Sequence, residues 1–88
     1  MDHKTNIHEL KELVKSFCDE RDWDQFHNAK DLAIGIVTES SELLDHFRFK
    51  SDEQVKEMFN NEKKKKELTE EMADVLYFLI RMAQKYDI

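Results

Sequence analysis

One glycine and no proline in 88 residues set the strongest limit on how this chain can fold. All-β folds need frequent tight turns, and glycine and proline dominate such turns. Charged residues make up 39% of the chain and hydrophobic residues 40%, and the hydrophobic residues recur three and four positions apart. This composition and spacing are typical of amphipathic helices. The sequence therefore predicts an all-α fold.

Four helices account for the pattern, and three of them have clear starts. Asn6, Asn28 and Ser51 are expected N-caps, because each precedes a helical pattern and has an acidic or amide residue three positions on. We expect helices over roughly residues 7–19, 29–47, 52–59 and 62–86. The predicted core stripe of the last helix consists of Leu68, Met72, Val75, Leu76, Leu79, Ala83 and Tyr86, and Ile80 and Phe78 widen it on either side.

The length predicts a single domain, residues 1–88, with a thin hydrophobic core. Three long apolar stripes need more cover than so short a chain can supply. We therefore expect a helical bundle that is completed by oligomerisation, as a homodimer or homotetramer.

Charge and cysteine content restrict the partners and the compartment. A net charge of −6 disfavours DNA or RNA as a partner, since binding nucleic acid requires neutralising phosphates. The lone cysteine, Cys18, cannot form an internal disulfide, which favours a reducing compartment. No apolar run is long enough to cross a membrane, and the N-terminus lacks the apolar stretch of a signal peptide. We expect a cytoplasmic protein with no membrane partner.

Two acidic pairs interrupt two of the apolar helical runs. Glu39 and Glu42 are three residues apart in one run, and Glu71 and Asp74 are three apart in another. Residues at this spacing are neighbours on one face of a helix. On a helical wheel Glu39 falls within roughly 20° of Leu32, at the edge of the predicted buried stripe. If the two helices pack side by side, the four carboxylates can meet.

Such a cluster is costly, because like charges and burial both disfavour ionised carboxylates. Mg²⁺, or Mn²⁺ in its place, would remove the repulsion, and Mg²⁺ prefers oxygen ligands. A ferritin-like di-iron site needs a Glu-x-x-His motif, which the chain lacks. The alternative is that the acids form salt bridges with Arg48, Lys50 or Arg81 at the helix borders.

Two further features have both a structural and a functional interpretation. The loop around Trp23, Phe26 and His27 carries aromatic rings that either pin it to the core or offer a platform for a nucleotide base. Gly35, one turn before Glu39, allows either close helix packing or room for a ligand beside the carboxylates.

Taken together, these motifs resemble a known family. Glu39-x-x-Glu42 followed by Glu71-x-x-Asp74 resembles the signature of the MazG-like all-α nucleoside triphosphate pyrophosphohydrolases. The segment Arg21-Asp22-Trp23-Asp24-Gln25-Phe26-His27 is similar to the dCTP pyrophosphatase branch of that family.

The resemblance implies Mg²⁺-dependent hydrolysis of a (deoxy)nucleoside triphosphate to the monophosphate and pyrophosphate, as nucleotide-pool house-cleaning. It implies four metal ligands, Glu39, Glu42, Glu71 and Asp74. We expect Glu42, or else Glu39, to activate the attacking water. The expected substrate-binding residues are Trp23, His27, Phe49, Lys30 and Phe78, with Lys50 and Arg81 as further candidates for the phosphates.

The family usually continues beyond the position of Ile88 into a segment near the phosphates. The alternative function is therefore a catalytically idle helical module that binds a nucleotide or a protein partner through the same cleft.

Overall fold

The structure is a computed structural model that describes residues 4–88. It contains four α-helices and one short 3₁₀ helix, and no strand occurs within the described residues, so the all-α prediction is confirmed. The elements in chain order are α1 (Ile7–Glu20), η2 (Asp24–Phe26), α2 (Ala29–Asp45), α3 (Asp52–Asn60) and α4 (Glu62–Lys85).

Side-chain caps begin the helices where the sequence predicts them. The Asn6 side chain accepts a hydrogen bond from the Glu9 amide, and Asn28 accepts one from the Asp31 amide, both at 2.8 Å. Ser51 forms a full capping box with Gln54. These bonds satisfy amide groups that the first turn of a helix leaves without partners.

The second helix ends earlier than expected. It stops at Asp45 rather than near Phe47, and residues 46–49 form turns. Phe49 has a φ of 60°, in the left-handed region that a continuing helix excludes. The chain therefore leaves α2 two residues, or about half a turn, before the expected end.

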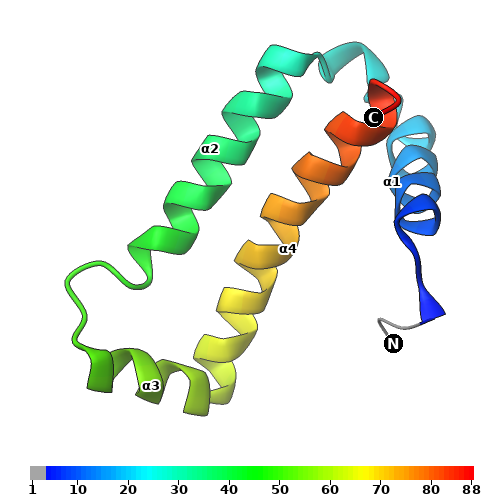
Figure 1. The fold of residues 1–88 in the computed structure, drawn as a ribbon. Helices are drawn as coiled ribbons and strands as arrows, with labels where there is room; N and C mark the ends of the chain where they lie inside the picture. Colours follow the sequence, from blue (N-terminus) through cyan, green and yellow to red (C-terminus); the bar gives the residue numbers. More distant parts are fainter. Residues whose placement is uncertain (1–3) are drawn as a thin grey trace.

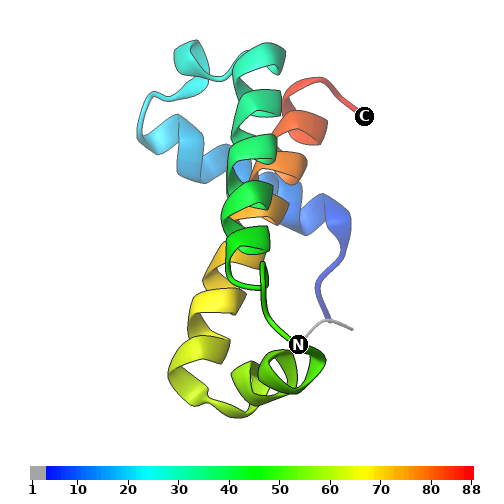
Figure 2. The same cartoon turned by 90° about the vertical axis from the view of Figure 1, so that its left-hand side faces the viewer.

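The longest helix, α4, is the centre of the fold. It contacts α1, α2 and α3. Figure 1 shows α2 running antiparallel to α4 along its length, with α1 on the opposite side of α4. In Figure 2 the short helix α3 crosses below the α2–α4 pair and connects their ends. The interface between α2 and α4 is the largest between described helices, and Glu39, Glu42 and Glu71 lie in it.

The predicted core stripe of α4 is only partly correct. Leu68 is buried, but Met72 is 59% exposed, and Leu76 and Leu79 are about half exposed. Phe78 and Ile80, which widen the predicted stripe, agree with the prediction, because Phe78 lies against α2 at Gly35 and Ile80 is buried. A helical wheel identifies an apolar face, but α4 has apolar residues on more than half of its circumference.

Gly35 allows close packing of the two helices. A Cβ atom at this position would lie 2.7 Å from Cε1 of Phe78, so the aromatic ring already occupies that space. The packing interpretation of Gly35 therefore fits the structure, and the space beside it is not free for a ligand.

We expect Gly35→Ala to lower the free energy of unfolding by about 1 kcal/mol. Overpacking costs about 1–3 kcal/mol, while the better helix propensity of alanine returns about 1 kcal/mol. Urea denaturation followed by circular dichroism measures the change, with Ser41→Ala on the exposed side of α2 as the control. A stabilised Gly35→Ala variant would show that the Phe78 ring moves away without cost.

The molecule is open for its size. Its accessible surface is 6860 Å², against about 5,500 Å² expected of a compact monomer of this length. Its radius of gyration is 15.3 Å, whereas a compact domain of this length has about 12 Å. None of the described helices is both long enough and apolar enough to cross a membrane.

Candidate metal site between α2 and α4

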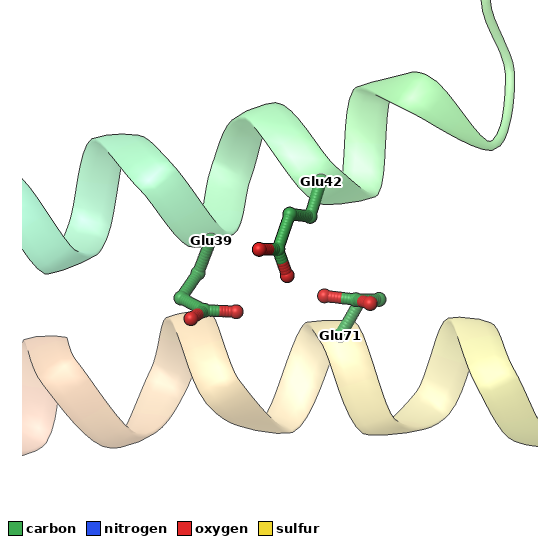
Figure 3. A group of neighbouring side chains, drawn as sticks. All are labelled: Glu39, Glu42 and Glu71. Atoms are coloured by element: carbon green, nitrogen blue, oxygen red, sulfur yellow. The ribbon is translucent and has the colours of Figure 1, made fainter.

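Three of the four predicted acidic residues come together. Glu39 and Glu42 of α2 and Glu71 of α4 each place a carboxylate oxygen so that the three oxygens lie within 4.8 Å of one another. Figure 3 shows the three side chains converging in the space between the two helices. The spacing of three residues puts both α2 carboxylates on the face turned toward α4.

Asp74, the fourth predicted ligand, is exposed and stands outside this group of three. Its charge nevertheless raises the pKa of both Glu39 and Glu71, which places it beside the cluster. The acidic pair on α4 is therefore divided, with one carboxylate inside the cluster and one next to it.

Burial and mutual repulsion both act on the cluster. Partial burial raises the pKa of Glu39 above its usual value, and the charges of Glu42 and Asp74 raise it further. Burial also raises the pKa of Glu71, followed by the charge of Glu42, while His46 acts in the opposite direction. The folded protein thus holds these carboxylates in a place where their charge is unfavourable.

One oxygen of the cluster lacks any partner. Oε2 of Glu71 is buried and accepts no hydrogen bond from residues 4–88, although buried polar atoms are nearly always bonded. The other oxygen of Glu71, Oε1, lies 3.8 Å from Nε2 of His46. Three converging carboxylates and a buried oxygen without a partner are suited to a hard divalent cation, which takes oxygen ligands.

The salt-bridge alternative does not fit the described residues. Arg48 pairs with Asp45 at 3.3 Å, and Arg81 pairs with Asp24 at 3.0 Å. Within residues 4–88, no lysine or arginine forms an ion pair with a member of the cluster. Among the described residues, His46 is therefore the basic side chain that faces the cluster, and it offsets only part of the charge of Glu71.

The aromatic loop lies at the start of α2 (Figure 1). Trp23 is half-buried, and its ring meets the Phe17 ring edge-on with the ring centroids 5.4 Å apart. The centroid of the His27 ring lies 6.0 Å from that of Trp23. Phe26 is 62% exposed. The packing interpretation therefore holds for Trp23 but not for Phe26.

The other predicted substrate-binding residues are dispersed. Lys30 is exposed at the start of α2, Phe78 is enclosed between the helices, and Phe49 is 93% exposed in the loop after α2. The 17 residues of α2 span about 25 Å. Trp23 and Phe49 therefore lie at opposite ends of α2, with the acidic cluster between them, and within one chain they cannot contact the same base.

Arg81 is placed differently from the prediction. It does not pair with Asp74, which lies about two turns earlier on α4, but reaches the aromatic loop, where it bonds Asp24 and His27. It is 1% exposed, which makes it unavailable to phosphates. Helical spacing predicts neighbours on the same helix, whereas this pairing joins residues 57 positions apart.

A contact between Cys18 and Tyr77 was also not predicted. The Cys18 thiol lies 3.1 Å from the Tyr77 hydroxyl, and burial raises the pKa of that hydroxyl. The sequence contains little signal for it, because Tyr77 lies on the side of the helical wheel opposite the predicted core stripe of α4.

Comparison with known proteins identifies relatives. Over 79 residues, 90% of this chain, it is 34% identical to dCTP pyrophosphatase 1 of Rattus norvegicus and 32% identical to that of Homo sapiens. The enzyme named dCTP pyrophosphatase 1 in Bos taurus is 32% identical over the same length. These alignments cover 46–47% of the relatives, so the chain spans about half their length.

None of the protein-family models compared with the chain matches it, and no solved structure matches it significantly. The sequence relationship agrees with the resemblance carried by the two acidic motifs and by the Arg21–His27 segment. Over nine-tenths of its length, this chain is therefore similar in sequence to dCTP pyrophosphatase 1 of several mammals.

Proposed function

We propose that this chain is a nucleoside triphosphate pyrophosphohydrolase domain, which cleaves a (deoxy)nucleoside triphosphate to the monophosphate and pyrophosphate. The observation that carries the proposal is the convergence of Glu39, Glu42 and Glu71 in a homologue of dCTP pyrophosphatases. dCTP is the first substrate to test, because the relatives are named for it.

The acidic cluster would hold the metal. Glu39, Glu42 and Glu71 supply the oxygens, and Asp74 stands close enough to assist. Mg²⁺ suits this ligand set, and Mn²⁺ is the alternative. When bound, a divalent ion neutralises the charge that develops on the triphosphate oxygens.

The proposed reaction leaves the protein two tasks, which are to place the triphosphate and to prepare a water molecule. Glu42 is the most exposed of the three clustered carboxylates, and it would accept a proton from the attacking water. Glu39 is the second candidate for this role. Both lie on one turn of α2, so a small change in water position would exchange their roles.

Base and phosphate binding would fall to the start of α2. Trp23 offers a ring face, His27 a ring nitrogen, and Lys30 a positive charge. Phe49 would take part only if a second copy brought it to the same nucleotide, and Phe78 would support the site through its packing on Gly35.

The exposed apolar surface supports a homodimer or homotetramer. A groove of about 270 Å³ on the α2–α4 pair is lined by Leu43, Met72, Val75, Leu76 and Leu79. Contiguous apolar surface of this kind is unfavourable in water unless it is covered, and a second copy would cover it. The net charge of −6 makes DNA or RNA unsuitable as the partner.

We expect Leu76→Asp to shift the protein toward monomers, because a carboxylate would have to lose its water in the covered groove. Analytical ultracentrifugation across a concentration series measures the shift. Leu44→Asp is the matched control, since Leu44 is similarly exposed on α2 but does not line the groove. A wild type that is monomeric at all concentrations would contradict the proposed assembly.

A nucleotide panel with product identification tests the function. Purified protein incubated with each dNTP and Mg²⁺ should release pyrophosphate, and EDTA should stop the release. Release of orthophosphate alone, or no turnover with any nucleotide, would refute the proposal. Binding of nucleotide without turnover would instead support the idle helical module.

A further inference from the structure

The aromatic loop is fixed to α4 by one buried arginine. The guanidinium of Arg81 donates from Nε to Nδ1 of His27 and from Nη2 to Oδ1 of Asp24, both at 3.0 Å. Its Nη1 donates to the side chain of Gln84 on the next turn of α4. Because a guanidinium is a rigid planar fork, these bonds fix its orientation and hold both ends of η2.

A second contact secures the same loop. Lys85 donates from Nζ to the backbone carbonyl of Asp24 at 2.6 Å, and it lies 3.5 Å from the carboxylate. The charges of Lys85 and Arg81 lower the pKa of Asp24, so that carboxylate stays ionised and remains an acceptor.

The bond from Arg81 determines the form of the His27 ring. Nδ1 can accept a hydrogen bond only when it carries no proton, so the neutral ring has its proton on Nε2. Burial lowers the pKa of His27, and the positive charges of Arg81 and Lys85 lower it further, against the opposing charge of Asp24. The Cys18 thiol also faces the ring, with its sulfur 3.8 Å from Nδ1.

Nε2 of His27 is therefore left as a donor. Within the described part of the chain, the hydrogen bonds of this ring involve Nδ1 only. The centroids of the Trp23 and His27 rings are 6.0 Å apart, so an aromatic ring and an N–H donor lie close together in this loop.

We propose that Arg81 is a positioning residue for nucleotide binding, which fixes His27 as a neutral ring whose Nε2–H donates to the bound nucleotide. This inference rests on the proposed function, because it takes the aromatic loop as part of the nucleotide site. Arg81 itself is too deeply buried to touch the ligand, so it acts only through His27 and the loop.

A double-mutant cycle tests the proposal, with KM and kcat for dCTP measured in Mg²⁺ for the wild type, Arg81→Met, His27→Ala and the double variant. We expect Arg81→Met to raise KM roughly fivefold, as for the loss of one hydrogen bond, with a smaller change in kcat. If Arg81 acts through His27, the double variant should match His27→Ala alone.

Two controls separate positioning from charge and from folding. Arg81→Lys keeps the charge but loses the planar fork, so it should raise KM as Arg81→Met does, and it replaces that variant if Arg81→Met does not fold. Lys56→Met, on the exposed side of α3, should leave KM unchanged.

An NMR titration of His27 should give a higher pKa in Arg81→Met than in the wild type.

Two results would overturn the proposal. One is an Arg81→Met variant with unchanged KM, and the other is a double variant in which the two KM effects multiply. A wild type that neither binds nor hydrolyses dCTP is a different failure, because it refutes the proposed function itself. The His27 titration is then still informative, since an unchanged pKa in Arg81→Met would show that Arg81 does not control the ring.

Discussion

Glu42→Gln should reduce pyrophosphate release from dCTP by about 10²- to 10⁴-fold, the range that a general base contributes. Glutamine keeps the size of the side chain but cannot accept the proton of the attacking water. The substitution also removes one of three converging carboxylate oxygens, so part of the loss would come from weaker metal binding. The measurement is kcat/KM from continuous pyrophosphate detection at saturating Mg²⁺.

Glu70→Gln is the matched control for this experiment. Glu70 is an exposed acid next to Glu71 in the sequence, but it lies outside the cluster, so its substitution changes the charge without removing a ligand. We expect its kcat/KM to stay within about threefold of the wild type, since surface substitutions away from special features have small effects. A Glu42→Gln variant as active as Glu70→Gln would refute the role of the cluster in the reaction.

Metal titration divides the effect of Glu42→Gln between its two causes. If weaker metal binding dominates, a higher Mg²⁺ concentration should restore much of the activity. If the lost base dominates, kcat should stay low at every Mg²⁺ concentration. The exposed position of Glu42 favours the second result, because Glu39 and Glu71 are the more enclosed ligands.

The acidic site was predictable because it depends on local geometry. A spacing of three residues on a helix fixes which carboxylates share a face, and the apolar residues around them indicate which face is turned inward. The convergence of Glu39 and Glu42 with Glu71 needed one further condition, which is that the two helices pack side by side. The repeated motif on two long amphipathic helices made that arrangement the natural expectation.

The other contacts of the site depend on how α4 is rotated against its neighbours, which the sequence does not specify. Apolar residues cover so much of α4 that several rotations would bury similar amounts of apolar surface. The observed rotation places Phe78 against Gly35 and leaves Met72 exposed. The same rotation directs Arg81 toward Asp24 instead of Asp74, and this long-range pairing has no local signal in the sequence.

Mg²⁺ should raise the melting temperature of the wild type by a large amount. A ligand that binds only the folded state, at a concentration of 100 times its Kd, raises the free energy of unfolding by about 2.7 kcal/mol. For a domain of this size, that corresponds to an increase of roughly 10 °C or more. The measurement is differential scanning calorimetry of EDTA-treated protein, with and without Mg²⁺, at pH 7.5 and constant ionic strength.

Glu71→Gln separates repulsion from metal binding in the same experiment. Without metal, the variant should melt above the wild type, because it removes a carboxylate whose charge is unfavourable in the folded state. Addition of Mg²⁺ should raise the melting temperature of the variant only slightly, because one of the three clustered carboxylates is lost. Glu70→Gln should respond to Mg²⁺ as the wild type does.

The pH dependence gives an independent test of the same charges. The pKa values of Glu39 and Glu71 are higher in the folded protein than in the unfolded chain, so the folded state binds more protons as these groups titrate. Metal-free protein should therefore lose stability as the pH rises from the ordinary glutamate pKa through these raised values. Mg²⁺ should remove that loss, and Glu71→Gln should reduce it. A melting temperature that rises over this pH range without metal would show that the three carboxylates do not repel one another. A melting temperature that does not change with Mg²⁺ at neutral pH would show that they do not hold the ion.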